Sequence, residues 1–340
     1  MLSVDGLHLR RGGFALGPLS LEVERGSYLA LVGPSGSGKT LLLEWMAGFE
    51  RADAGSLKID GKDVTAMPPQ QRPVSVVYQD SALFPHLSVR DNIGFALRVT
   101  GKGRDFADKR IGEVAETLSI ARHLDADVAA LSGGERRRVA LARALVLPRP
   151  VLLLDEPLSA LDAHLRWQLS TELDRVRQQF DLTVVHVTHD LSLVSSIASH
   201  LAVLGGGKLI QSGWCDDVLD HPSSAEVAAA LDVANFVEAA GDADAGCMRL
   251  PGGGELPAPK VPGKHVRARI TGLKVADGEG GGRLAGTCIG IRRRTGEPAL
   301  LRVVLDVPDD VVVFELPAAG ETRVGERLFI DFGDASYDYY

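Results

Sequence analysis

The chain has 340 residues, 45% of them hydrophobic, and its formal net charge at pH 7 is −8. This length suits two or three domains, and the acidic charge is atypical of a nucleic-acid-binding protein, which usually carries a basic excess. The three cysteines, Cys215, Cys247 and Cys288, are widely spaced and odd in number. They therefore favour a reducing compartment over a disulfide framework or a metal site.

The apolar residues are not gathered into a membrane-spanning segment. The richest apolar stretch, Val139 to Leu154, is interrupted by arginines and prolines, whereas a membrane helix needs roughly 18 apolar residues in a row. The first residues also lack the long apolar core of a signal peptide. If this protein serves a membrane, we therefore expect it to act from the cytoplasmic face.

The first half of the chain alternates short β-rich runs with helical patterns, which favours a parallel sheet flanked by helices. Strands are expected at Tyr28–Val32, Val74–Tyr78, Val151–Leu154 and Thr183–Val187. Helices are expected at Thr40–Ala47, Ala107–Leu118 and Arg136–Leu147. The helical stretch of about 82–150 is interpreted as a subdomain inserted into the sheet domain.

A glycine-rich loop follows the first of these strands and precedes the first of these helices. It matches the pattern G-x-x-x-x-G-K-[ST] and consists of Gly33, Pro34, Ser35, Gly36, Ser37, Gly38, Lys39 and Thr40. Glycines let successive N–H groups point at phosphate oxygens, Lys39 reaches the β- and γ-phosphates, and Thr40 binds Mg²⁺. A chance glycine turn would not need this strand and helix context, so the loop predicts a site for ATP with Mg²⁺. Phe14 has two interpretations of equal weight: stacking on the adenine, or core packing.

Two adjacent carboxylates stand at the end of the strand Val151–Leu154. The carboxyl ends of strands are where open α/β sheets bind ligands. Asp155 suits the coordination shell of Mg²⁺, and Glu156 suits the base that orients or deprotonates the attacking water. Alone, such a pair is more often a solvated turn or a helix cap, but together with the glycine-rich loop it predicts catalysis.

The loop Ser132, Gly133 and Gly134 precedes the helical pattern that begins at Arg136. A hydroxyl, glycine amides and a helix N-terminus together form an anion site. The sequence Leu131-Ser132-Gly133-Gly134-Glu135 resembles the signature of the ABC ATPases. In that family the signature contacts the γ-phosphate held by the partner subunit, so the resemblance implies an ATPase that acts as a homodimer.

Further residues match this family in order along the chain. Gln79 matches the Q-loop residue that senses Mg²⁺ and water, Asp162 in Ser159-Ala160-Leu161-Asp162 matches the D-loop of the dimer interface, and His189 matches the switch histidine of the γ-phosphate. Each residue alone would be an ordinary surface or structural side chain. The resemblance covers nearly all of 1–235 and implies an ABC cassette, an α/β P-loop NTPase fold with a helical subdomain.

Two kinds of ABC ATPase remain to be separated. The main hypothesis is an importer subunit without a membrane span, in which Gln79–Leu97 grips a helix of an integral membrane permease; local core packing is the other interpretation of its apolar residues. The rival is a soluble ABC ATPase of translation or DNA maintenance. One cassette is present, and Lys39 and Ser132 are separated by roughly ninety residues, too few for a long coiled coil. The importer hypothesis is preferred.

The composition changes after about Phe236, where Gly and Pro accumulate and short β-like runs appear. We expect 236–340 to be a small β-barrel domain of OB-like type, ending in a disordered tail. It resembles the regulatory extension of oxyanion, iron, polyamine and sugar importers, although Val266-Arg267-Ala268-Arg269-Ile270 departs from the usual pattern. A structural dimer contact is ranked slightly ahead of a regulatory ligand site.

The transported substrate is predicted only by kinship. The N-terminal run up to Thr40 and the sequence His186-Val187-Thr188-His189-Asp190-Leu191 look more like molybdate or tungstate importers than sugar importers. Sulfate, iron, polyamine and sugar remain alternatives. The resemblance also implies an indirect partner, an extracytoplasmic solute-binding protein, and a peripheral location on the cytoplasmic face of the membrane.

Overall fold

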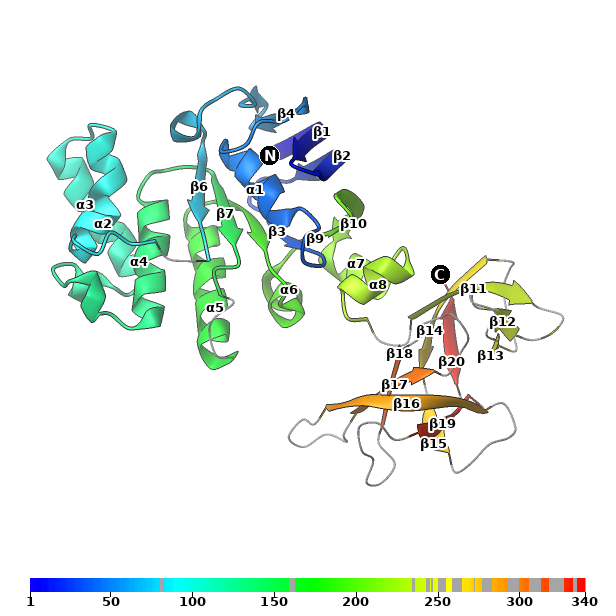
Figure 1. The fold of residues 1–340 in the computed structure, drawn as a ribbon. Helices are drawn as coiled ribbons and strands as arrows, with labels where there is room; N and C mark the ends of the chain where they lie inside the picture. Colours follow the sequence, from blue (N-terminus) through cyan, green and yellow to red (C-terminus); the bar gives the residue numbers. More distant parts are fainter. Residues whose placement is uncertain are drawn as a thin grey trace. The chain divides into compact units, whose positions relative to one another are not determined.

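The computed structural model describes most of the N-terminal two thirds of the chain and the strands of the remainder. The described residues are 1–79, 82–158, 163–233, 236–242, 245, 247–249, 255–258, 265–271, 273–276, 283–292, 300–305, 313–317, 327–332 and 335–339. The chain divides into two compact units, Met1–Asp220 and His221–Tyr340 (Figure 1). Within the described part, none of the helices is both long and apolar enough to cross a membrane.

A six-stranded sheet forms the centre of the first unit, in the order β10-β9-β3-β8-β7-β6. Its strands are β3 (Tyr28–Val32), β6 (Val74–Val77), β7 (Val151–Asp155), β8 (Thr183–Val187), β9 (His200–Gly205) and β10 (Lys208–Trp214). All neighbouring pairs are parallel except β9 with β10. The four predicted strands are thus four parallel strands of one sheet, and their near-continuous burial explains why they read as apolar runs.

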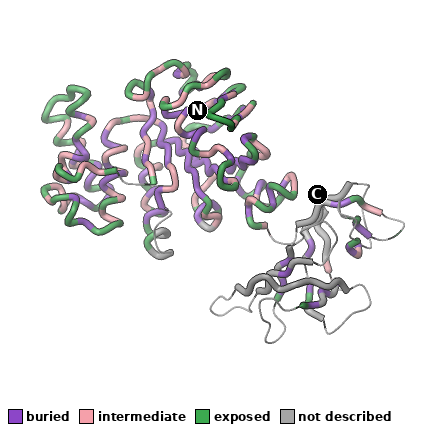
Figure 2. The backbone as a smooth tube through the Cα atoms, in the orientation of Figure 1, coloured by how far each residue is buried: buried purple, intermediate pink, exposed green. Residues whose placement is uncertain are grey.

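The two faces of this sheet enter two different hydrophobic cores. Along β7, Leu153 packs into one core whereas Leu152 and Leu154 pack into the other, as the two-residue period of a strand requires. Helix α5 (Ala163–Gln179) covers the second face through residues such as Leu173. Figure 2 shows most of the sheet as buried, whereas the edge strand β10 is largely intermediate or exposed.

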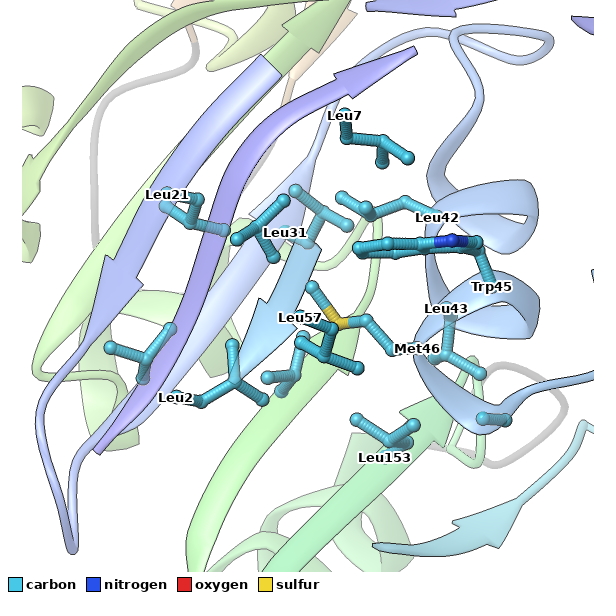
Figure 3. Packing of buried hydrophobic residues seen from close by; sticks show 14 of the residues in the cluster. Leu2, Leu7, Leu21, Leu31, Leu42, Leu43, Trp45, Met46, Leu57 and Leu153 are labelled. Atoms are coloured by element: carbon cyan, nitrogen blue, oxygen red, sulfur yellow. The ribbon is translucent and has the colours of Figure 1, made fainter. Parts of the chain in front are cut away.

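The first core lies between helix α1 (Lys39–Ala47) and a second, antiparallel sheet. This sheet has the order β2-β1-β4-β5, with β1 (Leu2–Arg11), β2 (Phe14–Val23), β4 (Ala54–Ile59) and β5 (Lys62–Asp63). Trp45 and Met46 of α1 are fully buried against leucines of both sheets (Figure 3). This packing fixes α1, and therefore the loop at its N-terminus, against the sheet.

The helical part of the first unit comprises α2 (Val89–Val99), α3 (Arg104–Thr117) and α4 (Gly133–Leu145), with short 3₁₀ turns at Ala121–His123 and Val128–Ala130 (Figure 1). Its apolar faces join the second core through Ile93, Val114 and Val139. A further 3₁₀ turn spans Pro69–Gln71. The unit ends with α6 (Leu191–Ile197) and α7 (Cys215–Asp220).

The second unit begins with α8 (Ala225–Ala230), which contacts β11. One antiparallel sheet has the order β13-β12-β11-β14-β20, with β11 (Phe236–Asp242), β12 (Cys247–Arg249), β13 (Glu255–Pro257), β14 (His265–Thr271) and β20 (Ser336–Tyr339). The other has the order β15-β19-β16-β17-β18, with β15 (Lys274–Ala276), β16 (Arg283–Arg292), β17 (Leu300–Leu305), β18 (Val313–Pro317) and β19 (Arg327–Asp331). The predicted β-rich character is present, and the barrel type remains a prediction.

The expected disorder of the C-terminal tail is wrong for Ser336–Tyr339, which form β20. This strand pairs with β14, with Tyr337 opposite Ile270 and Tyr339 opposite Ala268. Backbone hydrogen bonds to a strand far away in the sequence satisfy its polar groups. Composition alone could not reveal such a partner.

Candidate functional site

The loop between β3 and α1 has a backbone that only glycine adopts without strain. Gly33 has φ of 147°, and a Cβ there would lie 2.1 Å from the carbonyl oxygen of Leu204. Gly38 has φ of 100° and occupies the N-cap of α1 without a side chain to cap the first turn. The N–H groups of that turn are therefore left for an anion. Pro34, Ser35 and Gly36 are exposed between these glycines, and Ser37 is buried.

A cavity of about 670 Å³ opens beside this loop. Its size is in the range of small-molecule sites. The residues that line it come from β1, β2, α1, and the ends of β3, β7 and β8: Arg11, Phe14, Gly33, Ser35, Gly36, Gly38, Lys39, Thr40, Leu41, Glu44, Glu156 and His189. The structure thus brings most of the sequence-predicted phosphate and catalytic residues around one space.

Lys39 is turned back onto the loop. Its Nζ donates hydrogen bonds to the carbonyl oxygens of Gly33 at 2.8 Å and Pro34 at 2.9 Å. Burial lowers the pKa of the ammonium group, and the nearby Glu156 and Asp155 partly oppose this shift. Neutral carbonyl oxygens are weaker partners for an ammonium group than phosphate oxygens are. The side chain is therefore placed to exchange them for a phosphate.

Thr40 and Asp155 join the start of α1 to the end of β7, with Thr40 Oγ1 donating to Asp155 Oδ1 at 3.3 Å. Burial raises the pKa of Asp155, and the charges of Glu156 and Glu44 add to this effect. A divalent cation would relieve this crowding of carboxylates. Among the described residues, no group of three or more His, Cys, Asp or Glu side chains could hold a metal alone. The donors here fit Mg²⁺, which is usually bound by one or two carboxylates together with substrate phosphates.

Glu156 has φ of 45°, a left-handed backbone that is uncommon outside glycine. Its N–H donates to the carbonyl oxygen of Val187 at 3.0 Å, which ties the turn after β7 to the end of β8. Its carboxylate Oε1 lies 3.3 Å from Nδ1 of the exposed His189. Such conformations gather at functional sites. The turn places the predicted base and the predicted switch histidine side by side at the cavity.

Phe14 packs in the core and also reaches the cavity, and its stacking on adenine remains a prediction. The ring lies over the start of α1, where a Cβ on Gly38 would be 3.1 Å from Phe14 Cε1. It packs against the first core and also lines the cavity. An apolar ring surface is therefore available at the edge of the cavity for a planar base.

The glycine pair of the predicted signature lies at the N-terminus of α4 and does not line this cavity. Ser132 caps the helix: its Oγ accepts from the N–H of Glu135 at 3.3 Å, and Glu135 Oε2 accepts from the N–H of Ser132 at 2.9 Å. Hydrogen bonds from Ser132 are the main cause of the lowered pKa of Glu135. Ser132 and Gly133 are exposed. The loop is preformed and open to another molecule.

Gln79 and Asp162 complete the sequence-predicted set. Gln79 follows β6, is exposed and is not among the residues that line the cavity. Its carbonyl oxygen accepts a hydrogen bond from Nη1 of Arg137 on α4. Asp162, with Ser159, lies outside the described residues.

Sequence reasoning missed polar contacts at the cavity and within the sheet. Arg11 forms ion pairs with Glu44 at 2.8 Å and Glu50 at 3.2 Å. Within the sheet, the Tyr28 hydroxyl and His186 Nδ1 are 2.6 Å apart, and His186 Nε2 is buried with no hydrogen-bond partner among the described residues. These pairs join residues 33 and 158 positions apart, so no local motif carries them.

The loop, the cavity and the carboxylates at the end of β7 define a P-loop nucleotide-binding protein. The family described as ABC transporter matches residues 16–159. The molybdate/tungstate import ATP-binding protein of Pyrococcus horikoshii is 40% identical over 238 residues, which are 70% of this chain and 69% of the relative. The spermidine/putrescine import ATP-binding protein of Thermotoga maritima is 38% identical over 65% of this chain and 60% of its own length.

A solved dimeric structure of a bacterial ABC transporter cassette is similar in fold. The TM-score is 0.56 and the identity 24%, over 63% of this chain and 99% of that one. The chain belongs to the ABC transporter family, as an ATP-binding subunit of the import type. The predicted family and cassette fold are therefore confirmed, and the protein is an ATPase.

Proposed function

We propose that this ATPase works as a homodimer that drives import of molybdate or tungstate through membrane permease subunits. The observation that carries the proposal is that the nucleotide cavity and the Ser132 loop lie at separate places on one chain. Lys39, Glu156 and His189 share one cavity, whereas the preformed loop at Ser132 lies outside that cavity on its own chain. A second copy that supplied its Ser132 loop would complete the site.

In the proposed ATP complex, the N–H groups of Gly33–Thr40 and the ammonium group of Lys39 hold the phosphates. Lys39 exchanges its bonds to the loop carbonyls for bonds to the β- and γ-phosphates. The adenine stacks on Phe14, at the edge of the cavity.

Thr40, Asp155 and Gln79 would hold Mg²⁺ beside the phosphates. The bound ion would neutralise phosphate charge and orient the β- and γ-groups. The Thr40–Asp155 hydrogen bond and the raised pKa of Asp155 mark the place where the protein's oxygen donors converge.

Hydrolysis requires a water molecule in line with the γ-phosphate. Glu156 orients this water and accepts its proton, and His189, which follows β8, contacts the γ-phosphate from beside Glu156. The water oxygen forms a bond to the γ-phosphorus, the bond between the β–γ bridging oxygen and the γ-phosphorus breaks, and ADP and phosphate leave. Loss of the γ-phosphate removes the ligand that both chains hold, so the dimer reopens.

Transport follows from this opening and closing. Gln79–Leu97 is the proposed groove for the permease, and Asp162 of the D-loop is proposed at the dimer interface. Closing on ATP moves the grooves and shifts the permease between inward-facing and outward-facing states. The chain would then be a peripheral protein on the cytoplasmic face of the membrane. A solute-binding protein would deliver the substrate to the permease without contacting this chain.

The oxyanion substrate is supported by the Pyrococcus relative, whose name specifies molybdate and tungstate. The polyamine importer subunit of Thermotoga has a similar identity, so kinship ranks the substrates only weakly. The ATPase does not touch the solute during transport. Sulfate, iron, polyamine and sugar are therefore alternative cargoes of the same machine.

Residues 236–340 are proposed to form a small OB-like regulatory domain outside the hydrolytic site. Contact between two copies in the dimer is the first candidate role, and binding of a regulatory oxyanion is the second. Transport measured with excess molybdate on the cytoplasmic side distinguishes the two roles. A domain that binds a regulatory oxyanion would inhibit transport by stabilising the open state, whereas a domain that only joins two copies would not.

The deciding experiment is an ATPase assay of the protein in proteoliposomes with candidate permeases. Each permease is paired with its binding protein, loaded in turn with molybdate, sulfate or spermidine. We expect stimulation of ATP hydrolysis by the molybdate-loaded system. Stimulation by spermidine alone would refute the proposed molybdate or tungstate substrate. The absence of Mg²⁺-dependent hydrolysis under every condition would refute the proposed mechanism of hydrolysis.

A further inference from the structure

Helix α4 carries arginines that hold the segment after β6 by its backbone. Arg137 Nη1 donates to the carbonyl oxygen of Gln79, and Arg143 Nη1 donates to the carbonyl oxygen of Ala82 at 2.8 Å. The Arg143 guanidinium also lies 5.4 Å from the centre of the Phe84 ring. The two arginines are six positions apart in the sequence, which corresponds to a rise of about 9 Å along the helix. The segment is thus attached to α4 at two separate points along the helix.

The following residues are held from α2. The fully buried Asn92 accepts from the N–H of Phe84 at 2.8 Å and donates to the carbonyl oxygens of Phe84 and Leu87, each at 3.1 Å. Phe84 further packs on Phe95, with ring centroids 4.6 Å apart. Gln79, Ala82, Phe84 and Leu87 are therefore held by contacts with two helices.

Helix α4 is fixed on another side as well. Arg138, the neighbour of Arg137, pairs with Glu172 of α5 at 2.9 Å, and both side chains are largely buried. Burial raises the pKa of Glu172 and lowers the pKa of Arg143. Because each partly buried guanidinium makes hydrogen bonds, it resists displacement, since a lost partner would leave a desolvated donor.

We propose that Arg137, with Arg143 as second anchor, is a positioning residue for ATP hydrolysis. It fixes the backbone of Gln79 relative to α4, whose N-terminus carries the Ser132 loop. The inference rests on the proposed roles of Gln79 and Ser132. A movement of Gln79–Leu87, where a permease helix is proposed to dock, then displaces both groups together. Arg137 is not among the residues that line the cavity beside the glycine-rich loop, and it acts through Gln79.

The first test measures the tether without nucleotide. Amide hydrogen exchange is followed by mass spectrometry in the full chain, in peptides that span Tyr78–Phe84. Arg137→Gln removes the charged donor and should accelerate exchange there several-fold, because local opening becomes easier. Arg137→Lys keeps a charged donor and should restore most of the protection. Arg104→Gln, at a 92% exposed arginine of α3, is the matched control and should change nothing in these peptides.

The second test is a double-mutant cycle in the ATPase assay. Arg137→Gln should lower kcat about tenfold with little change in KM, since misplacement of a positioned group affects mainly the chemical step. In a Gln79→Ala background, the same substitution should have no further effect, because the side chain that it positions is gone.

Three results would overturn the proposal: unchanged exchange in Tyr78–Phe84, unchanged kcat in Arg137→Gln, or an equal fall of kcat in both Gln79 backgrounds. Peptides from β3 and β8 report whether a variant is globally unfolded. In that case Arg137→Met, which keeps an apolar stem but lacks the donor, replaces Arg137→Gln in both tests. A wild-type protein that does not hydrolyse ATP would refute the proposed function. Hydrogen exchange would still show whether Arg137 holds the backbone of Gln79.

Discussion

Glu156 shows how one residue can depend on its backbone. Its left-handed conformation and its N–H bond to Val187 place the carboxylate at the cavity, 3.3 Å from His189. The side chain is not part of the phosphate loop. Chemistry and nucleotide binding should therefore be separable at this position.

We expect Glu156→Gln to bind ATP but to hydrolyse it at least about a hundredfold more slowly, because the amide cannot accept the proton of water. ATP should then trap a stable dimer, which size-exclusion chromatography with and without Mg-ATP would detect. Glu50→Gln, which changes a carboxylate paired with Arg11, serves as a control for the loss of one negative charge. Hydrolysis near the wild-type rate would remove Glu156 from the mechanism.

We expect His186 to make the stability of the sheet dependent on pH. Burial lowers its pKa from an ordinary 6.5 to about 3, with the charge of Asp190 opposing the shift, and Tyr28 faces its Nδ1. Between these values the unfolded chain binds a proton that the folded chain does not. The stability contribution is thus present above pH 6.5 and is lost progressively as the pH falls towards 3.

His186→Gln keeps a neutral partner for Tyr28 at every pH. It should flatten the fall of unfolding free energy between roughly pH 6 and pH 4, by up to about 1.4 kcal/mol per pH unit. Urea unfolding of the wild type and the variant across this range measures the two slopes. The exposed His86, changed to Gln, should leave the slope unaltered. Parallel curves for wild type and His186→Gln would show that this histidine does not cause the dependence.

The site residues that form contiguous motifs could be predicted from the sequence, because a phosphate-binding loop needs consecutive backbone amides. The loop Gly33–Thr40, Asp155 with Glu156, and His189 were named from the sequence, and most of these residues line one cavity. Arg11 with Glu44 and Tyr28 with His186 escaped, because their partners meet only in the folded chain.

Helix α4 is the element that presents the signature loop. Ser132 and Glu135 form a reciprocal cap that orders this N-terminus without any ligand. Ser132 is exposed, and neither Ser132 nor Glu135 lines the cavity of its own chain. A substitution here should therefore act on the partner's site.

Ser132→Arg should abolish hydrolysis while the affinity of the dilute monomer for ATP stays within about twofold of the wild type. The bulk and the lost cap should obstruct closure of the dimer, and removal of such a cap alone costs about 1 kcal/mol of stability. Fluorescent ATP titration at low protein concentration measures the affinity, and Ser132→Thr, which retains a capping hydroxyl, is the control. A parallel loss of monomer affinity would place Ser132 in the site of its own chain.

Among the elements, four of the parallel strands were predicted, whereas β9, which pairs in parallel with β3, and the antiparallel sheet were missed. Leu2–Arg11 and Phe14–Val23 alternate buried and exposed positions and are joined by Gly12-Gly13, a recognisable hairpin pattern. That signal was available from the sequence. The pairing of β20 with β14 was not, because it depends on a register between distant segments.

The whole molecule consists of two compact units that divide between Asp220 and His221, earlier than the composition change at Phe236. The difference arises from α8, whose contact with β11 lies within the second unit. Every described residue of the proposed hydrolytic site lies in the first unit. The second unit should therefore be dispensable for hydrolysis.

A chain that ends at Asp220 should be soluble and hydrolyse ATP within about threefold of the full-length rate, since a unit with its own core folds alone. A chain that ends at Leu231 is the comparison, because it retains α8 without β11. Circular dichroism and an ATPase assay check both variants. Loss of folding in the Asp220 variant, with the full chain intact, would show that the second unit stabilises the cassette.

The separation of the Ser132 loop from the cavity that holds Lys39 has a consequence for kinetic order. If two copies must meet before either turns over, dilute protein should hydrolyse ATP at a rate that rises with the square of its concentration, and concentrated protein at a rate that rises linearly. Inactive Lys39→Ala and inactive Ser132→Arg chains should then partly rescue each other on mixing. Each mixed pair contains one combination of intact Lys39 and intact Ser132, so two defective genes would together encode a working site.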